Sequence, residues 1–177
     1  MAIELKTPLG SAAARALRAG DMCLLTGELY TARDAAHKRL TALIADGGEL
    51  PFPLEGSCIY YAGPTPPMHG RVCGSFGPTT SCRMDAFAPL LYDLGMTATI
   101  GKGGRSNEVK EAIVRNGGLY LLAIGGAGAV AASHITSMEE IAFAELGCES
   151  VKKLVFDDFP LIIGTDAYGN DIFERNR

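Results

Sequence analysis

The sequence has no excess of basic residues and no basic cluster. Its 16 lysines and arginines are outnumbered by 20 aspartates and glutamates, which gives a net charge of −4 and a pI of about 5.4. Clusters of lysine and arginine with aromatic residues are typical of nucleic-acid binding, and no segment of this sequence contains one. We therefore expect neither nucleic acid nor a membrane as a partner. A few cations gathered in one cleft can still bind a small anion.

Long apolar segments are also missing. The longest run, residues 119–132, is interrupted by three glycines. It is also shorter than the roughly 20 residues that a membrane-spanning helix needs. Residues 1–8 contain no apolar core of an export signal. The sequence therefore predicts a soluble protein of the cytoplasm.

The cysteine spacing of a metal site and the common catalytic motifs are absent too. The five cysteines form no Cys-x-x-Cys pair and have no histidine at metal-ligand spacing; they are Cys23, Cys58, Cys73, Cys82 and Cys148. Apart from Cys82, we expect them to be reduced thiols packed in the core, as in cytosolic proteins. The sequence also has no P-loop, no Gly-x-Ser-x-Gly elbow and no His-Glu-x-x-His zinc motif.

What the sequence does contain is an alternation of strand-like and helix-like segments, with 47% hydrophobic residues and no low-complexity linker or repeat. Strands are predicted at residues 22–25, 28–30, 58–62, 71–76, 97–100, 119–124, 154–156 and 161–165. Helices are predicted at residues 11–18, 31–46, 80–94 and 106–116. The predicted fold class is α/β, with a mixed β-sheet core flanked by helices, in a single domain over residues 1–177.

The first long helix is predicted to begin beside a cation. The amino end of a helix carries unpaired N–H groups and a partial positive charge, so it usually attracts aspartate or glutamate. With Thr31 as N-cap, Arg33 falls at the second helical position and Asp34 at the third, where it can complete a capping box. His37 lies four residues after Arg33, on the same helix face, and can support it from behind.

Two more predicted helices begin in the same way. With Thr80 or Ser81 as N-cap, Arg83 falls in the first helical turn. Lys102 and Arg105 lie on the approach to a third helix start, within a glycine-rich loop. A cation is mildly unfavourable at such a position, so an anion is expected to share each site.

The residue types around these helix starts suit a carboxylate or a phosphate. Backbone N–H groups, the hydroxyls of residues 79–81 and a guanidinium are all anion-binding groups, and two or three such sites converging would bind a dicarboxylate. Simpler explanations exist for each site taken alone. Arg33 could pair with Asp34, the hydroxyls could be only a helix cap, and Lys102 could be a solvated turn residue.

Residues 126–131, Gly-Ala-Gly-Ala-Val-Ala, match the dinucleotide-binding pattern Gly-x-Gly-x-x-Ala. The match is weak because the nearest acids, Glu145 and Glu149, precede the next strand and too little chain follows for a nucleotide-binding half. We expect close backbone packing or an anion-binding helix start there, with NAD(P) binding as the alternative.

Several segments resemble the C-terminal region of class I fumarases, which in two-subunit members is a separate β chain and is also found in L(+)-tartrate dehydratase. The resemblance follows the chain in order and covers nearly all of it. It rests on residues 31–40 (TARDAAHKRL), 61–64 (YAGP), 77–85 (GPTTSCRMD), 100–103 (IGKG) and 164–170 (GTDAYGN).

The resemblance implies a fold, a cofactor and a partner. The fold would be a swivelling β/β/α domain. A [4Fe–4S] cluster would be bound by three cysteines of a partner α subunit and by no residue of this chain, and its open iron would act as a Lewis acid on the substrate. The assembly would be a homodimer or a heterotetramer that is active only with the α subunit. Cys82 departs from the family pattern. It is expected to be either a space-filling residue or an oxidation-sensitive thiol.

Site residues follow from the same resemblance. Arg33, Arg83 and Lys102 would hold the substrate carboxylates, together with Thr80. Thr79 would contact the substrate and is the implied base, although a threonine hydroxyl needs a strongly lowered pKa for that role. Asp34 and His37 would lie behind these residues.

Three functions are open at this point. The first is the β subunit of a fumarate hydratase, which would reversibly hydrate fumarate to (S)-malate. The second is the β subunit of L(+)-tartrate dehydratase, and the third is a non-catalytic module that binds a small anion. The block at residues 31–38 is more similar to fumarases, which favours fumarate.

Overall fold

The computed structural model describes residues 2–67 and 70–174. They form one sheet of seven strands in the order β1-β2-β3-β4-β5-β7-β6. The strands are β1 (Ile3–Lys6), β2 (Met22–Thr31), β3 (Cys58–Tyr60), β4 (Ala98–Gly101), β5 (Leu119–Leu122), β6 (Ile135–Ala142) and β7 (Val151–Thr165). The α-helices are α1 (Ser11–Arg15), α2 (Asp34–Ala45), α3 (Ala88–Asp93), α4 (Asn107–Asn116) and α5 (Gly128–Ser133). Two 3₁₀ helices, η1 (Ser81–Met84) and η2 (Ala144–Glu149), complete the set.

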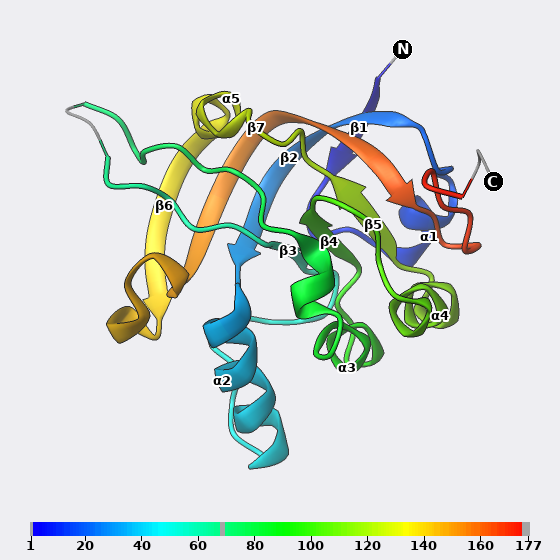
Figure 1. Ribbon diagram of the computed structural model, residues 1–177, viewed down its shortest axis with the longest axis horizontal. Coiled ribbons are helices and arrows are strands. Elements are labelled where there is room, and N and C mark those ends of the chain that lie inside the picture. The colour runs from blue at the N-terminus through cyan, green and yellow to red at the C-terminus, as the bar shows by residue number, and fades with distance from the viewer. Residues whose placement is uncertain (1, 68–69, 175–177) are drawn as a thin grey trace.

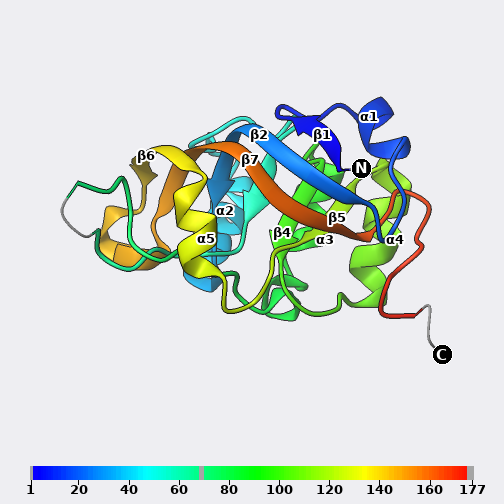
Figure 2. The same ribbon diagram turned by 90° about the horizontal axis from the view of Figure 1, so that it is seen from above.

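The sheet is mixed and curls into a partial barrel. β1 to β5 pair in parallel, whereas β7 is antiparallel to β5, β6 and β2. Because β7 pairs with both β5 and β2, the strands β2-β3-β4-β5-β7 close into a ring. Figure 1 shows β7 curving over the top of the molecule beside β2, and Figure 2 shows the two strands side by side from above. The predicted fold class, a mixed sheet flanked by helices, is confirmed.

Strand alternation divides the core into two clusters. In β3, Cys58 and Tyr60 join a cluster made mainly of strand residues, with a few from α1, α5 and loops, whereas Ile59 between them joins the cluster that contains residues of α2, α3 and α4. This is the period of two that a strand imposes on its side chains. One face of the sheet is therefore covered by helices, and the curl of the sheet encloses the other face.

Several predicted elements have different limits. Residues 71–76 are a loop rather than a strand, and the predicted strands 154–156 and 161–165 are one strand, β7, with an irregularity facing Leu25 and Gly27 of β2. The predicted helix 80–94 is divided into η1 and α3. Pro89 lies in the first turn of α3, where its missing N–H is tolerated, and in a longer helix it would break the backbone ladder.

Two strands, β1 and β6, were not predicted. β6 carries serine and glutamate on its exposed positions and lies at the edge of the sheet, so its sequence has no strong apolar alternation. None of the helices in the described part of the chain combines the length and the apolar character of a membrane-spanning segment.

Candidate functional site

The candidate residues lie at one edge of the sheet because of the parallel strands. β2, β3 and β4 run side by side in parallel, so their carboxyl ends meet at the same edge. Arg33 follows the end of β2 and Lys102 follows the end of β4. The segment that carries Thr79, Thr80 and Arg83 lies on the long connection after β3.

The backbone joins the threonine segment to Lys102. Thr80 and Lys102 form a parallel bridge, in which the Ser81 N–H donates to the Lys102 carbonyl (2.9 Å) and the Lys102 N–H donates to the Thr79 carbonyl (3.3 Å). The Thr79 N–H donates to the Tyr61 carbonyl, which anchors the segment to the end of β3. Thr80 and Lys102 have exposed side chains and Thr79 is half-buried. Three of the predicted site residues are therefore neighbours.

Arg83 joins this segment to helix α2. Its Nε and Nη2 atoms donate to the two carboxylate oxygens of Asp34 at 3.0 and 2.7 Å. Asp34 is the first residue of α2 rather than the third, and it pairs across to Arg83 instead of capping its own helix. The Arg83 side chain is 49% exposed, so the guanidinium still faces solvent.

The prediction that Thr31 caps α2 is wrong. Thr31 is the last residue of β2, and its buried hydroxyl accepts a hydrogen bond from the Lys152 N–H (3.0 Å) and donates to the Ser150 carbonyl (3.3 Å). Arg33, not Thr31, is the residue that precedes the helix. The strand pairing of β2 thus continues to the position where the sequence pattern favoured a helix cap.

An internal acid occupies the amino end of α2. Glu149 of η2 forms an ion pair with Arg33 (3.3 Å), and its other oxygen accepts the Ala35 N–H (3.0 Å). The anion expected at this helix start is therefore supplied by the chain itself. Glu149 is 114 residues away from Ala35, so no local pattern in the sequence could identify this contact.

His37 is buried behind Arg33. Its Nδ1 atom donates to the Arg33 carbonyl at 2.9 Å, and its ring packs against Tyr61 and Phe87. The Nε2 atom is buried without a hydrogen-bond partner among the described residues. Burial lowers the pKa of His37 to about 4, although the bond to the Arg33 carbonyl opposes this change. The ring is therefore neutral at pH 7.

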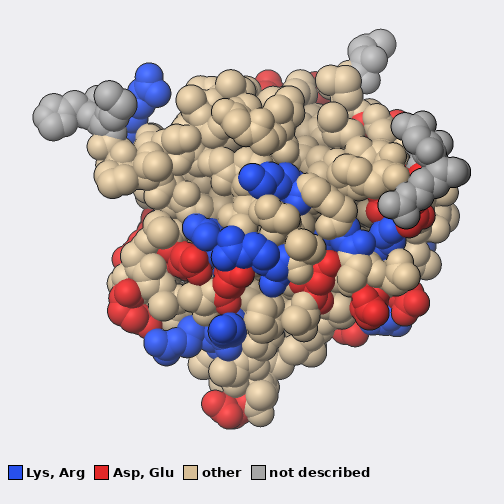
Figure 3. Space-filling view, in the orientation of Figure 1, with Lys and Arg blue, Asp and Glu red and all other residues tan. Residues whose placement is uncertain are grey.

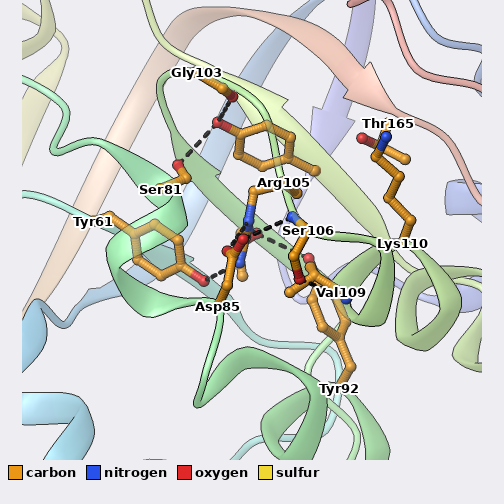
Figure 4. Close-up of polar contacts among 12 residues, drawn as sticks. Tyr61, Ser81, Asp85, Tyr92, Gly103, Arg105, Ser106, Val109, Lys110 and Thr165 are labelled. Carbon is orange, nitrogen blue, oxygen red and sulfur yellow. Dashed lines mark hydrogen bonds and ion pairs between the residues drawn. The ribbon is translucent and has the colours of Figure 1, made fainter. Parts of the chain in front are cut away.

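Below the exposed residues lies a buried polar network around Arg105 (Figure 4). The Arg105 side chain is completely buried and donates to Asp85 (2.7 Å), Thr99 (2.9 Å) and Tyr61 (3.3 Å). Burial disfavours its charge, but Tyr61, Tyr92 and Asp85 raise the pKa of Arg105 overall. Arg105 therefore points into the protein, away from the edge that carries Lys102. It links the glycine-rich loop to Asp85, which follows η1 directly.

The five cysteines are all free, and they differ in burial. Cys23, Cys58 and Cys73 are buried, as predicted, whereas Cys148 is exposed, contrary to the prediction, and Cys82 is exposed as well. Burial raises the pKa of the Cys23 thiol to about 12, so it stays protonated. Within residues 2–67 and 70–174, no group of three or more histidine, cysteine and acidic side chains is arranged to hold a metal ion.

The glycine-rich segment 126–131 does not form a dinucleotide-binding unit. The strand that follows α5 is β6, and the antiparallel strand β7 lies between β5 and β6, so β5, α5 and β6 do not make the unit of two neighbouring parallel strands that the motif requires. Gly128 packs closely against Ser75 and Gly77, where any Cβ atom would clash. The glycine therefore serves close packing, one of the two expected roles.

Of the candidate residues, Thr80, Arg83 and Lys102 are exposed at the surface. Lysine and arginine side chains form a band across the middle of the face in Figure 3, with acidic side chains next to them. A cavity of about 490 Å³ is lined by other residues, among them Ser11, Tyr92 and Thr97, and none of the predicted site residues takes part in it.

We expect the buried, neutral His37 to make the protein less stable in mild acid. In the unfolded chain the His37 ring is protonated below about pH 6.5, whereas in the folded protein it is protonated only below about pH 4. The free energy of unfolding therefore falls by about 2 kcal/mol between pH 7 and pH 5. Denaturant unfolding of wild type and His37→Gln at both pH values measures this difference. An equal loss of stability in the two proteins would contradict the assignment.

We expect Gly101→Ala to disturb the site. A Cβ atom at Gly101 would overlap the Ser81 hydroxyl and lie 3.1 Å from Tyr61 Cδ2, so η1 must shift or the free energy of unfolding must fall by roughly 2 kcal/mol or more. Gly104→Ala, three residues further along the chain, is the matched control, because its Cβ atom meets nothing closer than 3.9 Å. Thermal unfolding of both variants checks the prediction, which fails if they are equally stable.

Comparisons with a family model and with individual proteins indicate the same family. The family model described as fumarase C-terminus matches residues 1–176. Fumarate hydratase 2 of Leishmania major is 38% identical over 177 residues, which cover 98% of this chain and 31% of that protein. The anaerobic class I fumarate hydratase of Escherichia coli (strain K12) is 43% identical over 153 residues, 85% of this chain and 28% of that protein. The L(+)-tartrate dehydratase subunit beta of the same organism is 33% identical over 178 residues, 98% of this chain and 87% of that subunit.

Proposed function

Because the chain belongs to the fumarase C-terminus family, whose members include hydro-lyases, we propose that it is the substrate-binding β part of an iron–sulfur-dependent fumarate hydratase. The enzyme would reversibly hydrate fumarate to (S)-malate. The chain spans 26–31% of the length of the fumarate hydratases that it matches. We propose that the remaining functions come from a partner α subunit. The observation that carries the proposal is the bridge between Thr80 and Lys102, which places hydroxyls and a cation side by side at one sheet edge.

Arg83 is suited to hold one substrate carboxylate. Asp34 accepts from Nε and Nη2, and a guanidinium has five N–H donors, so three remain free for a ligand. Asp34 also fixes the plane of the guanidinium, which lowers the entropy lost when a carboxylate binds. Lys102 would supply a point charge beside it, and the exposed Thr80 hydroxyl a further hydrogen bond.

Arg33 would bind substrate in competition with an internal acid. Glu149 already pairs with its Nη2 atom, and the Nε atom is buried without a hydrogen-bond partner among the described residues. A substrate carboxylate would therefore use the remaining Nη donors. We propose a weaker contribution from Arg33 than from Arg83. His37 and Asp34 would hold these two arginines in place.

Thr79 would contact the substrate from the half-buried start of the same segment. An ordinary hydroxyl is too weak an acid to serve as a base near neutrality, so this role requires a strong positive field from the neighbouring cations. We therefore propose substrate contact for Thr79 and the role of base only in the assembled enzyme.

The [4Fe–4S] cluster would belong to the α subunit. The arrangement of side chains supports this proposal, because the described residues contain no group of three or more histidine, cysteine and acidic side chains that could hold a metal ion. When bound there, the cluster would supply a Lewis acid for the substrate hydroxyl. This chain would bind and orient the carboxylates, in a homodimeric or heterotetrameric assembly.

L(+)-tartrate is the second candidate substrate, and one observation favours it. The chain is 38% and 33% identical to two proteins named as beta subunits of L(+)-tartrate dehydratase, one of them putatively. Both substrates are dicarboxylates that would need the same cations. The choice between them depends on residues that contact the central carbons.

The test is a reconstitution. The purified chain is mixed anaerobically with its cluster-bearing partner, and the hydration of fumarate and the dehydration of L(+)-tartrate are both assayed. We expect activity in the mixture and none in either chain alone. Activity of the partner alone, unchanged by this chain, would remove the chain from catalysis. Dicarboxylate binding without activity in the mixture would instead favour the anion-binding module.

Within an active mixture, Arg83→Gln should lower kcat/KM about 100-fold, because it removes charge-assisted hydrogen bonds to the substrate. Arg39→Gln is the matched control. Arg39 is also exposed and paired with an acid, Glu145 at 3.0 Å, but it lies further along α2. Equal effects of the two substitutions would show that Arg83 acts only through surface charge.

A further inference from the structure

One tyrosine hydroxyl lies between the two segments that carry the candidate residues. Tyr120 of β5 is fully buried, and its hydroxyl donates to the Gly103 carbonyl (2.7 Å). The same oxygen lies 2.9 Å from Ser81 Oγ. Because the only hydroxyl proton of Tyr120 goes to Gly103, Ser81 is the donor in the second bond. Both hydrogen bonds are drawn as dashed lines in Figure 4.

These two partners stand directly beside the candidate residues. Ser81 follows Thr80, and Gly103 follows Lys102. The other ends of the segments are tied by the Arg105–Asp85 ion pair, since Asp85 follows η1 and Arg105 ends the loop. Tyr120 therefore fixes the ends nearest to Thr80 and Lys102. Between these segments the backbone adds only two bonds, and the one from the Lys102 N–H is long, at 3.3 Å.

We propose that Tyr120 is a positioning residue, whose hydroxyl sets the spacing between Thr80 and Lys102 so that both reach the same substrate carboxylate. This inference rests on the proposed function of the site. Without the hydroxyl, the buried Ser81 Oγ and the partly buried Gly103 carbonyl both lose a hydrogen-bond partner, which is unfavourable. Both belong to surface segments, so they can move apart to reach water, and the distance between Thr80 and Lys102 changes.

Tyr92 provides a matched comparison. Its hydroxyl is equally buried, donates to the Leu119 carbonyl (2.7 Å) and lies 2.8 Å from Thr99 Oγ1. Thr99 belongs to the middle of β4 and Leu119 to β5, which pair with each other, so neither can move outwards. Thr99 Oγ1 also accepts from Arg105 (2.9 Å), and this hydrogen bond does not involve the Tyr92 hydroxyl. Tyr92→Phe thus loses the same kind of hydrogen bonds as Tyr120→Phe, but the partners that Tyr92 loses belong to paired strands of the sheet.

The experiment compares Tyr120→Phe and Tyr92→Phe in the chain reconstituted with its cluster-bearing partner. We expect Tyr120→Phe to raise KM for the dicarboxylate roughly tenfold with a smaller change in kcat, and Tyr92→Phe to leave both near the wild-type values. Amide hydrogen exchange of the same proteins should be about tenfold faster in residues 79–84 and 101–105 for Tyr120→Phe only. Equal KM values or equal exchange in the two variants would overturn the inference.

The exchange measurement separates this inference from the proposed function. If the wild-type mixture is inactive, the proposed function fails, and the exchange rates still decide whether Tyr120 couples the two segments. If Tyr120→Phe does not fold, Ser81→Ala takes its place, since it removes only the hydrogen bond between the Tyr120 hydroxyl and Ser81 of η1. Faster exchange in residues 79–84 of Ser81→Ala, compared with wild type, would support the coupling, and unchanged exchange there would overturn it.

Discussion

The ion pair between Arg105 and Asp85 is the interaction on which the candidate site depends. Removing a guanidinium from water is strongly unfavourable unless its donors are satisfied, and here Asp85, Thr99 and Tyr61 each accept one of them. The loss of one partner of such a pair typically costs about 3–5 kcal/mol. The same pair connects the end of η1 to the glycine-rich loop, so the stability of the fold and the geometry of Thr80 and Lys102 have a common origin.

The cations at the sheet edge are balanced by acids of the chain itself. Asp34 pairs with Arg83, and Glu149 pairs with Arg33 while it accepts an N–H at the start of α2. Lys102 differs from the two arginines, because no ion pair joins it to an acid among the described residues. In the proposed enzyme, a dicarboxylate would gain most from Lys102 and from the free donors of Arg83, whereas at Arg33 it would replace part of an existing interaction.

Local signals in the sequence predicted the elements that local chemistry determines. Ser106 caps α4 through its hydroxyl and Gly117 ends it in the left-handed conformation, as the pattern of residues 106–118 indicates. The predicted start of α2 was wrong, because the pairing of β2 with neighbouring strands keeps Thr31 in an extended conformation. Glu149 and the inward direction of Arg105 could not be predicted, since both depend on contacts between segments far apart in the sequence. Thr80 and Lys102 are neighbours because the adjacent strands are parallel. The predicted fold class, a mixed sheet, did not specify which strands run in parallel.

The exposure of the candidate residues has a consequence for affinity. Ion pairs at a protein surface contribute about 0–1 kcal/mol, because water screens the charges and the side chains lose entropy. Thr80, Arg83 and Lys102 are exposed, while the network that holds them is buried. In the proposed enzyme, tight binding of a dicarboxylate therefore requires a second surface that covers these side chains and excludes water, since the same charges interact more strongly at lower effective dielectric. A buried polar network below exposed cations and hydroxyls is the arrangement that one half of the proposed shared active site would need.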